Sequence, residues 1–561
     1  MTWSNRSCFI VLFIISITLP VCHIFVEPSF TVKWESWLFL SFLGGCLLVL
    51  SRKGIPNAMN VDRLYLYVSL LTTYLSARAY MIDFDIIALM YGSSFWLVYS
   101  YFYFEREVAW LDYWITVGLV FVGVIQAITG IVQYIGGDNF VMGTYDNPAG
   151  FAISLACILP FGCSAISRTG SDKTKYLYET GLILIIIAVL LSDSRTGIIA
   201  SLIVLLFWKV RSRKVIGIIL FGVFLSLAFL HKSHSTLGHG FIYQTSLTMV
   251  DGHSFFWGRG CGSFKRDYMK YQANELRKYP ENHATTMLAD NVFHPFNEFL
   301  LILIEYGAIT LLLLSGILFF IFTSCKRNSC GLLCMVAIVV SSCFSYPFRY
   351  PLILFLLAYS LASFRIKVIY NVRIRKNMIV PVFFVVCMCG MLLVLNDVRK
   401  QYMWKRQTIK CSLGKYQEAQ LNYMKLLSSM QCNPYFLFNY SNILFQMKDF
   451  NASLGGINRC TQYLNDYDTE MLLADNHSAL NNYIEAELHY IQASFMCPNR
   501  FRPLYRLMQL YDERGAREKA QAMAFRILEK PVKIPSKDIA NMKLEARNLY
   551  NNGKIYNEKR D

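Results

Sequence analysis

His294-Pro-Phe-Asn297-Glu298-Phe-Leu-Leu-Ile-Leu-Ile-Glu-Tyr-Gly307 is the stretch in which a long polar segment re-enters an apolar helix. A histidine, an amide and a carboxylate placed just before about twenty apolar residues cost insertion energy that a purely structural helix would avoid. On a helix, His294, Asn297 and Glu298 would share one face, because they are spaced by three and four residues. We expect this face to border a functional site. The alternative is a helix cap with ordinary interfacial polar residues.

Outward from this stretch, the chain is too apolar for a soluble globule. Its 561 residues are 55% hydrophobic and 15% aromatic, with a mean hydropathy of +0.37. We therefore predict an all-α protein, a polytopic membrane helical bundle of about 12–13 spans followed by a helical repeat domain. The apolar runs lie at about residues 8–26, 36–51, 64–80, 84–104, 113–135, 148–167, 177–193, 196–208, 215–231, 297–323, 331–346, 350–364 and 378–395.

The net charge of +17 is a topology signal rather than a nucleic-acid footprint. Basic residues gather in alternate loops, as they do in cytoplasmic loops of membrane proteins. With a cytoplasmic N-terminus and an odd number of spans, the loop at about 232–293 and everything after 396 would face outward. The predicted domains are a membrane domain over residues 1–396, which includes that loop, and an outer repeat domain over 397–561.

A tight polar turn between two spans, Ser192-Asp-Ser-Arg195-Thr-Gly197, places an arginine at the outer boundary, against the usual charge bias. A phosphate or diphosphate is a natural partner, because a guanidinium offers two-pronged donors that stay charged. The alternatives are a pair with Asp193 or interfacial snorkelling. A second polar segment, Gly143 to Gly150, opens another span, and a loop with a helix N-cap would explain it.

The outer loop contains His239 and the run Gly258-Arg259-Gly-Cys-Gly262. Nothing predicts a strand before these glycines, so a dinucleotide site is rejected and a flexible basic loop over a site is favoured. The histidine and cysteine spacings do not support a zinc site or a redox motif. Asp83 and Asp85 would suit a divalent cation, but solvated loop residues are the favoured interpretation. We expect no metal and no cofactor.

A repeat is visible after the last span. Tyr416, Phe450, Tyr483 and Arg517 occupy equivalent positions, separated by 34, 33 and 34 residues, and each precedes a small residue by three. This period predicts three to four tetratricopeptide-like helical hairpins, in which neighbouring pairs bury a shared core. An unrelated helical bundle is the alternative.

Taken together, these motifs resemble those of the O-antigen ligase family of membrane glycosyltransferases, which also includes O-antigen polymerases and protein O-oligosaccharyltransferases. The resemblance covers roughly residues 110–365 and rests on the ordered segments 143–151, 192–197 and 294–307. It implies an enzyme of the bacterial inner membrane that transfers a glycan from undecaprenyl diphosphate to an acceptor on the periplasmic face. The acceptor would be a lipid A-core sugar, as in lipopolysaccharide biosynthesis, or a protein hydroxyl.

The resemblance also implies roles for single residues. Arg195 would bind the diphosphate, and His294 would act on the acceptor hydroxyl in a direct, inverting, metal-independent transfer. Two departures weaken the match: His294 lies three residues before Asn297 rather than directly before it, and His239 stands where a basic residue is common. The remaining candidate substrate-binding residues are Arg259, Asn297, Glu298, Arg349 and His239.

Other functions remain open at this stage. A polymerase of the same family would differ only in its acceptor, whereas a flippase for lipid-linked glycans should show internal repeats or broken helices. A non-catalytic scaffold would rest on the repeat domain alone. The expected partners are the lipid-linked donor, the acceptor, membrane lipids and a protein bound through the repeats, and no nucleic acid is expected.

Overall fold

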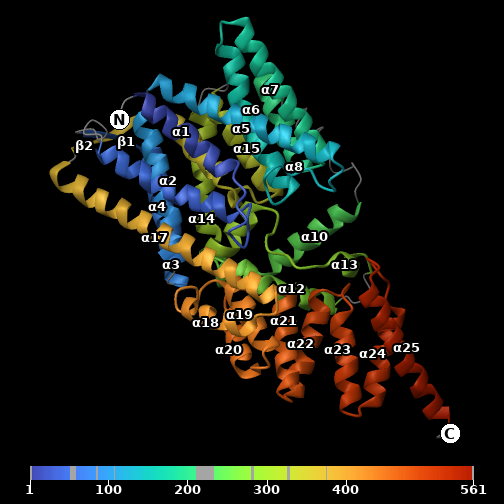
Figure 1. The fold of residues 1–561 in the computed structure, drawn as a ribbon. Helices are drawn as coiled ribbons and strands as arrows, with labels where there is room; N and C mark the ends of the chain where they lie inside the picture. Colours follow the sequence, from blue (N-terminus) through green and yellow to red (C-terminus); the bar gives the residue numbers. More distant parts are fainter. Residues whose placement is uncertain are drawn as a thin grey trace. The chain divides into compact units, whose positions relative to one another are not determined.

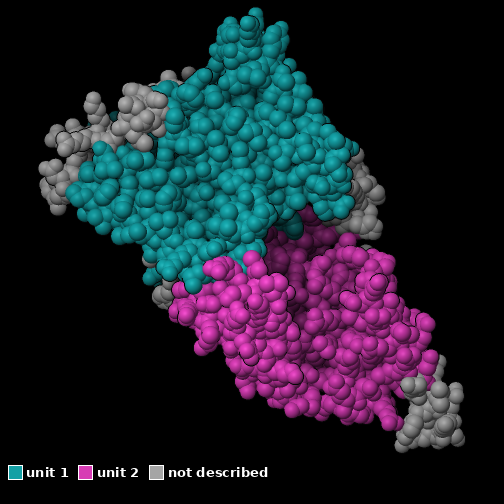
Figure 2. Space-filling model, viewed as in Figure 1, with its two compact units in different colours: residues 1–231, 296–405 teal, residues 232–295, 406–561 magenta. Residues whose placement is uncertain are grey.

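The computed structural model describes residues 3–50, 58–83, 86–106, 108–209, 233–278, 283–324, 329–364, 366–373 and 376–558. Over these residues the predicted all-α class is confirmed, with a single two-stranded ribbon added (Figure 1). The chain divides into two compact units, coloured separately in Figure 2. Unit 1 comprises residues 1–231 and 296–405, and unit 2 comprises residues 232–295 and 406–561.

Unit 1 carries the apolar helices. These are α1 (Trp3–Thr18), α2 (Thr31–Leu50), α3 (Arg63–Asp83), α4 (Ile86–Glu105), α5 (Ala109–Ile135), α6 (Pro148–Arg168), α7 (Asp172–Leu191), α8 (Arg195–Lys209), α14 (Glu298–Ser324), α15 (Cys330–Phe344), α16 (Pro351–Ser363) and most of α17 (Lys376–Ser412). Among the described residues, six helices are long and apolar enough to cross a membrane, and three shorter ones are apolar. The chain is therefore a multi-pass membrane protein. The span predicted at 215–231 lies outside the described residues.

Helix α6 is buried almost throughout, from Gly150 to Cys163, and packs against α5, α7, α8 and α15. Its start is encoded locally. The Asn147 side chain accepts a hydrogen bond from the Gly150 amide at 2.8 Å, and proline occupies the first helical position. Gly197 of α8 lies so close to α6 that a Cβ would overlap Ala152. The first turns of α6 and α8 are thus held together.

The sequence did not predict the ribbon. Strand β1 (Ala58–Asp62) pairs antiparallel with β2 (Val368–Arg373), and Ala58 lies opposite Arg373. At its other end Asp62 is fully buried and forms an ion pair of 3.1 Å with Arg106, which follows α4. The ribbon therefore ties the segment before α3 to the segment after α16.

Unit 2 contains the repeats. Its C-terminal helices are α18 (Tyr416–Leu427), α19 (Pro434–Gln446), α20 (Phe450–Cys460), α21 (Tyr467–Ala479), α22 (Tyr483–Met496), α23 (Arg502–Glu513), α24 (Arg517–Glu529) and α25 (Lys537–Glu558). Helices α18, α20, α22 and α24 begin at the four equivalent positions that the period predicts. The tetratricopeptide-like helical hairpins are confirmed.

The hairpins share their turn and their packing. Two residues before each of these four helices the backbone is left-handed, with φ between 62° and 76°, at Gly414, Lys448, Asn481 and Gly515. The fourth residue of each helix is small and fully buried, which lets the paired helix approach closely. These residues are Ala419, Ser453, Ala486 and Ala520.

Unit 2 also contains the segment that the sequence suggested was a loop of the membrane domain. It forms α10 (Ser233–Thr248), α11 (Ser254–Trp257), α12 (Ser263–Lys278) and α13 (His283–Leu288), and α12 packs against α22. The domain boundary expected at residue 396 falls inside α17, which continues without interruption to Ser412.

Candidate functional site

The end of α15 and its connection to α16, together residues 343–350 and called the connection below, gather the three segments on which the family resemblance rests. The first comes from the start of α14. Asn297 donates its Nδ2 hydrogen bond to the Cys343 carbonyl at 3.0 Å, and Glu298 Oε1 accepts one from the Phe348 amide at 3.1 Å. Glu298 is only 6% exposed, so its carboxylate mainly holds this connection in place.

The predicted helical face shared by His294, Asn297 and Glu298 is wrong. Helix α14 begins at Glu298, and Asn297 caps it by accepting a hydrogen bond from the Leu300 amide at 3.0 Å. Phe296 has φ of 54°, a left-handed conformation that no helix continues. His294 therefore lies in the loop before α14. The cap and the turn at Phe296 make the helix begin after His294.

The second segment is the turn 192–197. Asp193 has φ of 52°, and Arg195 is the first residue of α8. The next residue, Thr196, donates a hydrogen bond from Oγ1 to the Phe344 carbonyl at 3.5 Å. The turn that presents Arg195 is thus attached to the same connection as Asn297.

The third segment, Gly143–Gly150, contributes Asp146 and Asn147. Asp146 Oδ2 forms an ion pair of 3.0 Å with Arg349. Tyr350 donates its hydroxyl hydrogen bond to Asp146 Oδ1 at 2.9 Å and accepts one from Asn147 Nδ2 at 2.6 Å. Gly150 has no room for a side chain, because a Cβ there would overlap the Tyr350 ring. Aspartate, arginine and tyrosine therefore form one polar cluster beside the start of α6.

Burial and charge set the protonation of this cluster. Burial, reinforced by the negative charge of Asp146, raises the pKa of Tyr350 far above its ordinary value, so the phenol stays a donor. Burial lowers the pKa of Arg349, but Asp146 together with Tyr350, Glu27 and Tyr346 outweighs it, so the pKa is raised. The Arg349 side chain, 27% exposed and 4.6 Å from the centroid of the Phe30 ring, is a fixed cation that a ligand can still reach.

Sequence reasoning missed Asp146, Tyr350 and Lys33. Lys33 in the first turn of α2 is 2% exposed, donates a hydrogen bond from Nζ to the Thr144 carbonyl at 2.5 Å and lies 4.5 Å from the centroid of the Tyr145 ring. A lysine that starts an apolar helix is itself a signal, since ionisable groups at such positions are rare and often functional. Nothing in the sequence pairs it with residue 144.

The other predicted site residues lie in unit 2. Arg259 forms an ion pair of 2.6 Å with Asp251 and lies over the Tyr271 ring, 5.3 Å from its centroid. His239 of α10 makes an edge contact with Tyr243, with 6.3 Å between the ring centroids. His294 is partly exposed in the loop between α13 and α14. The structure thus brings Arg195, Asn297, Glu298 and Arg349 to one connection and places Arg259, His239 and His294 in the other unit.

The length of the chain between them still limits how far His294 can lie from Asn297. Three residues of fully extended chain span at most about 11 Å, so the Cα atoms of His294 and Asn297 are no farther apart than that. The described residues contain no group of three His, Cys, Asp or Glu side chains suited to a metal ion. Asp85 of the Asp83–Asp85 pair lies outside the described residues.

What the arrangement offers chemically is positive charge at the ends of apolar helices. The guanidiniums of Arg195 and Arg349 both belong to segments joined at residues 343–350, and each suits a phosphate oxygen pair. Such guanidiniums can stabilise an anionic leaving group.

Comparisons with known proteins bear on this site. Residues 180–315 match the profile of the O-antigen ligase family, and this range contains both Arg195 and His294. None of the curated proteins compared with the chain matches it. The crystal structure of yeast Tom70 is similar at 10% sequence identity, with a TM-score of 0.25, and the match covers 87% of this chain and 96% of that chain. That likeness is too weak to carry an argument. The apolar helices make the chain a multi-pass membrane protein with a helical repeat region, and residues 180–315 are similar to the O-antigen ligase family, which supports a glycosyltransferase-like role.

Proposed function

We propose that this protein transfers a glycan from undecaprenyl diphosphate to an acceptor hydroxyl on the periplasmic face of the bacterial inner membrane. The observation that carries the proposal is the convergence of the segments 143–150, 192–197 and 297–298 on the connection 343–350. Arg195 belongs to the second of these segments and Arg349 to the connection itself, and a diphosphate leaving group needs such cations. The family match supports the reaction class.

In the proposed reaction the acceptor oxygen attacks the anomeric carbon of the donor sugar. His294 takes the hydroxyl proton, and the bond between that carbon and the diphosphate oxygen breaks on the opposite face, so the configuration inverts. The electron pair leaves with the diphosphate, whose added charge Arg195 and Arg349 stabilise. An unperturbed histidine titrates near pH 6.5, which suits a general base at neutral pH.

Arg259 and His239 are proposed to contact substrate from unit 2. Arg259 is already oriented by Asp251, and a second anion would have to share it. Asn297 and Glu298 have structural partners, so we propose that they hold the backbone of the site in place beside the substrate. The acceptor is a lipid A-core sugar, a protein hydroxyl or the end of a growing glycan.

A parity argument and the distribution of charge support the proposed side of the membrane. Residues 232–295 and 406–561 pack into one compact unit, so both lie on the same side. An even number of spans must then separate them, and the helices between them are α14, α15, α16 and α17. The excess of basic residues in the alternate loops favours the periplasm for unit 2.

The test is a purified transfer assay. The full chain in lipid nanodiscs is given an undecaprenyl diphosphate-linked oligosaccharide together with lipid A-core or a serine-containing protein as the acceptor. We expect released undecaprenyl diphosphate and a glycosylated acceptor, with no loss of rate in EDTA. Donor consumption that EDTA abolishes, or no transfer to any of the acceptors, contradicts the proposal.

A further inference from the structure

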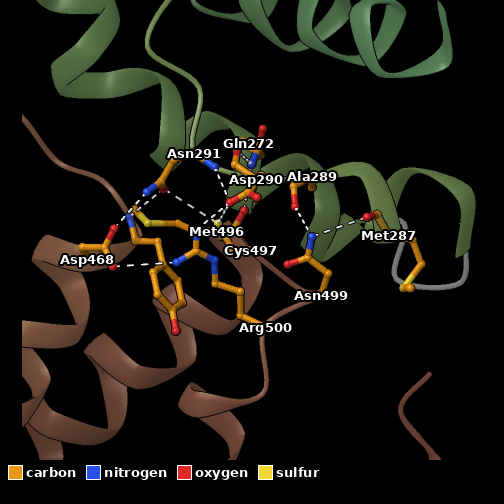
Figure 3. A network of polar contacts seen from close by, with 11 residues as sticks. Gln272, Met287, Ala289, Asp290, Asn291, Asp468, Met496, Cys497, Asn499 and Arg500 are labelled. Atoms are coloured by element: carbon orange, nitrogen blue, oxygen red, sulfur yellow. Dashed lines mark hydrogen bonds and ion pairs between the residues drawn. The ribbon is translucent and has the colours of Figure 1, made fainter. Parts of the chain in front are cut away.

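The last residues of the segment that precedes His294 are bound by the repeats (Figure 3). Asp290 Oδ1 forms an ion pair of 2.8 Å with Arg500, which belongs to the connection between α22 and α23. Asn291 donates a hydrogen bond to Asp468 Oδ2 at 3.1 Å and accepts one from the Tyr467 amide at 3.2 Å. Two consecutive residues are thus held through both their side chains.

The backbone of the same segment is held as well. Asn499 donates to the Ala289 carbonyl at 2.9 Å and to the Met287 carbonyl at 3.4 Å. Gln272 of α12 is fully buried and donates to the Asp290 carbonyl at 3.1 Å and to the Met496 carbonyl at 2.7 Å. One amide therefore joins α12, the end of the segment and the end of α22.

Further contacts orient two arginines in this region, Arg500 and Arg277. The Arg500 guanidinium lies 4.4 Å from the centroid of the Tyr467 ring, so the ring and the ion pair together orient its planar group. Arg277 near the end of α12 donates to Gln492 at 3.1 Å and lies 4.9 Å from the centroid of the Phe495 ring. Helix α12 is thus fastened along α22 at two points.

We propose that the start of α21 and the connection between α22 and α23 form a clamp that positions His294. We define the clamp as Asp468, Asn499 and Arg500 on the repeats with Asp290 and Asn291 on the segment. His294 follows Asn291 by three residues, so their Cα atoms lie within about 11 Å of each other. The Asn291 side chain is itself held by the two hydrogen bonds given above. The repeats then act first on the chain itself and only second on an outside partner.

This inference rests on the proposed function, in which His294 is the base for the acceptor hydroxyl. A base that is displaced by about 1 Å can lose about 10²-fold in rate, because general-base transfer needs hydrogen-bond geometry. Arg500 touches no substrate in this proposal and is a positioning residue. Loosening the clamp should lower kcat while leaving donor affinity unchanged, since Arg195 and Arg349 are in unit 1.

The experiment compares full-length variants in nanodiscs by hydrogen exchange and by transfer kinetics with the undecaprenyl diphosphate-linked donor. The double variant Asn291→Ala with Arg500→Ala removes both side-chain attachments. Arg500→Lys keeps the charge but loses the planar group, so it should fall between the double variant and wild type. Arg502→Ala is the matched control, because Arg502 pairs with Asp475 at 3.0 Å inside the repeats.

We expect residues 285–294 of the double variant to exchange faster than in wild type, while α21 to α24 stay protected. Its kcat should fall about 10- to 100-fold, with the KM for donor unchanged. Wild-type kcat despite faster exchange, or unchanged exchange of residues 285–294, overturns the clamp. A fall in kcat that appears only when α21 to α24 also lose protection likewise overturns it, because the role is then structural.

The two proposals fail differently in this design. If wild-type protein transfers no glycan, the proposed function is lost, and the exchange of residues 285–294 alone decides whether the clamp holds the segment. If wild type and Arg502→Ala transfer glycan and the double variant does so equally, the function stands and the clamp is refuted.

Discussion

Arg195 follows a strained turn, and the strain bears on its role. Asp193 has φ of 52°, a left-handed conformation that costs a residue with a side chain roughly 1 kcal/mol. The turn places Arg195 at the first position of α8, where the next residue bonds to the Phe344 carbonyl. The strained turn is thus retained in the folded protein, where it holds this segment against the candidate site.

Arg195→Ala should lower glycan transfer by about 10²-fold or more, because a fixed donor to the leaving group is lost. Arg195→Lys should recover part of the rate, since lysine keeps the charge without the two-pronged geometry. Initial rates of undecaprenyl diphosphate release measure both. Arg6→Ala is the control, because it removes a cation of unit 1 that pairs with Glu105 at 3.0 Å. Wild-type rates for Arg195→Ala would rule out its assigned role.

Tyr350→Phe tests the cluster around Arg349. The variant loses one hydrogen bond to Asp146 and one from Asn147, which should destabilise the protein by roughly 1–3 kcal/mol. We expect a lower Tm together with slower transfer, because Arg349 and Asp146 would no longer be fixed. Thermal denaturation in nanodiscs and initial rates are the measurements.

Tyr359→Phe separates stability from function in that experiment. Tyr359 lies in α16, the helix that follows Tyr350, and donates a comparable hydrogen bond to Asp112 at 2.9 Å. It should lower Tm similarly while leaving the transfer rate close to that of wild type. Equal losses of rate in the two variants would indicate that the cluster around Arg349 has only a structural role.

Among the elements, the contact between α6 and α8 is the one that sets the position of Arg195. Gly197→Ala adds a methyl group that overlaps Ala152 and approaches its carbonyl carbon to 2.9 Å. Overpacking of this kind costs roughly 1–3 kcal/mol. We expect lower thermal stability and slower transfer, because the first turn of α8 must move away from α6.

Gly316→Ala is the matched control for that change. Gly316 lies in α14, and a Cβ there would meet no atom within 4 Å. It should be neutral or slightly stabilising, because alanine is a better helix former than glycine. If Gly197→Ala is as well tolerated as Gly316→Ala, the close approach of α6 and α8 is not required.

At the scale of the whole chain, unit 2 is assembled from two segments far apart in sequence. A fragment from residue 405 to 561 should be helical by circular dichroism, because each hairpin has its own turn and buried small residues. Linking residues 232–295 to it should raise its Tm, since α12 then covers α22 and Gln272 regains its partners. Equal Tm values with and without the segment would contradict this. A linked Gln272→Ala variant, which should gain less, is the control.

Membrane topology supplies a second test at this scale. Reporter fusions at Lys265 and Lys530 should give the same result, because both residues belong to unit 2. We expect periplasmic reporters to be active and cytoplasmic reporters to be silent at both positions. A fusion at Lys173, in the first turn of α7 and within the predicted inner loop, should show the opposite pattern. Different sidedness at Lys265 and Lys530 would contradict the parity argument.

The sequence by itself determined the properties that repeat or persist along the chain. Apolar runs of spanning length predicted the membrane helices, because insertion depends on local composition. The spacing of 34, 33 and 34 residues predicted where α18, α20, α22 and α24 begin, because each hairpin uses the same turn and the same small residue. Arg195 was also visible, as a charge against the topological bias.

Only the tertiary structure decided which distant segments meet. Asp146 and Arg349 are 203 residues apart in the sequence, and Asn291 and Asp468 are 177 residues apart. No periodicity encodes either pair. The position of His294 depended on the cap at Asn297 and the turn at Phe296, which the apolar run after them concealed. Periodicity is a property of neighbouring residues along the chain, whereas such pairs form only when packed helices bring their ends together.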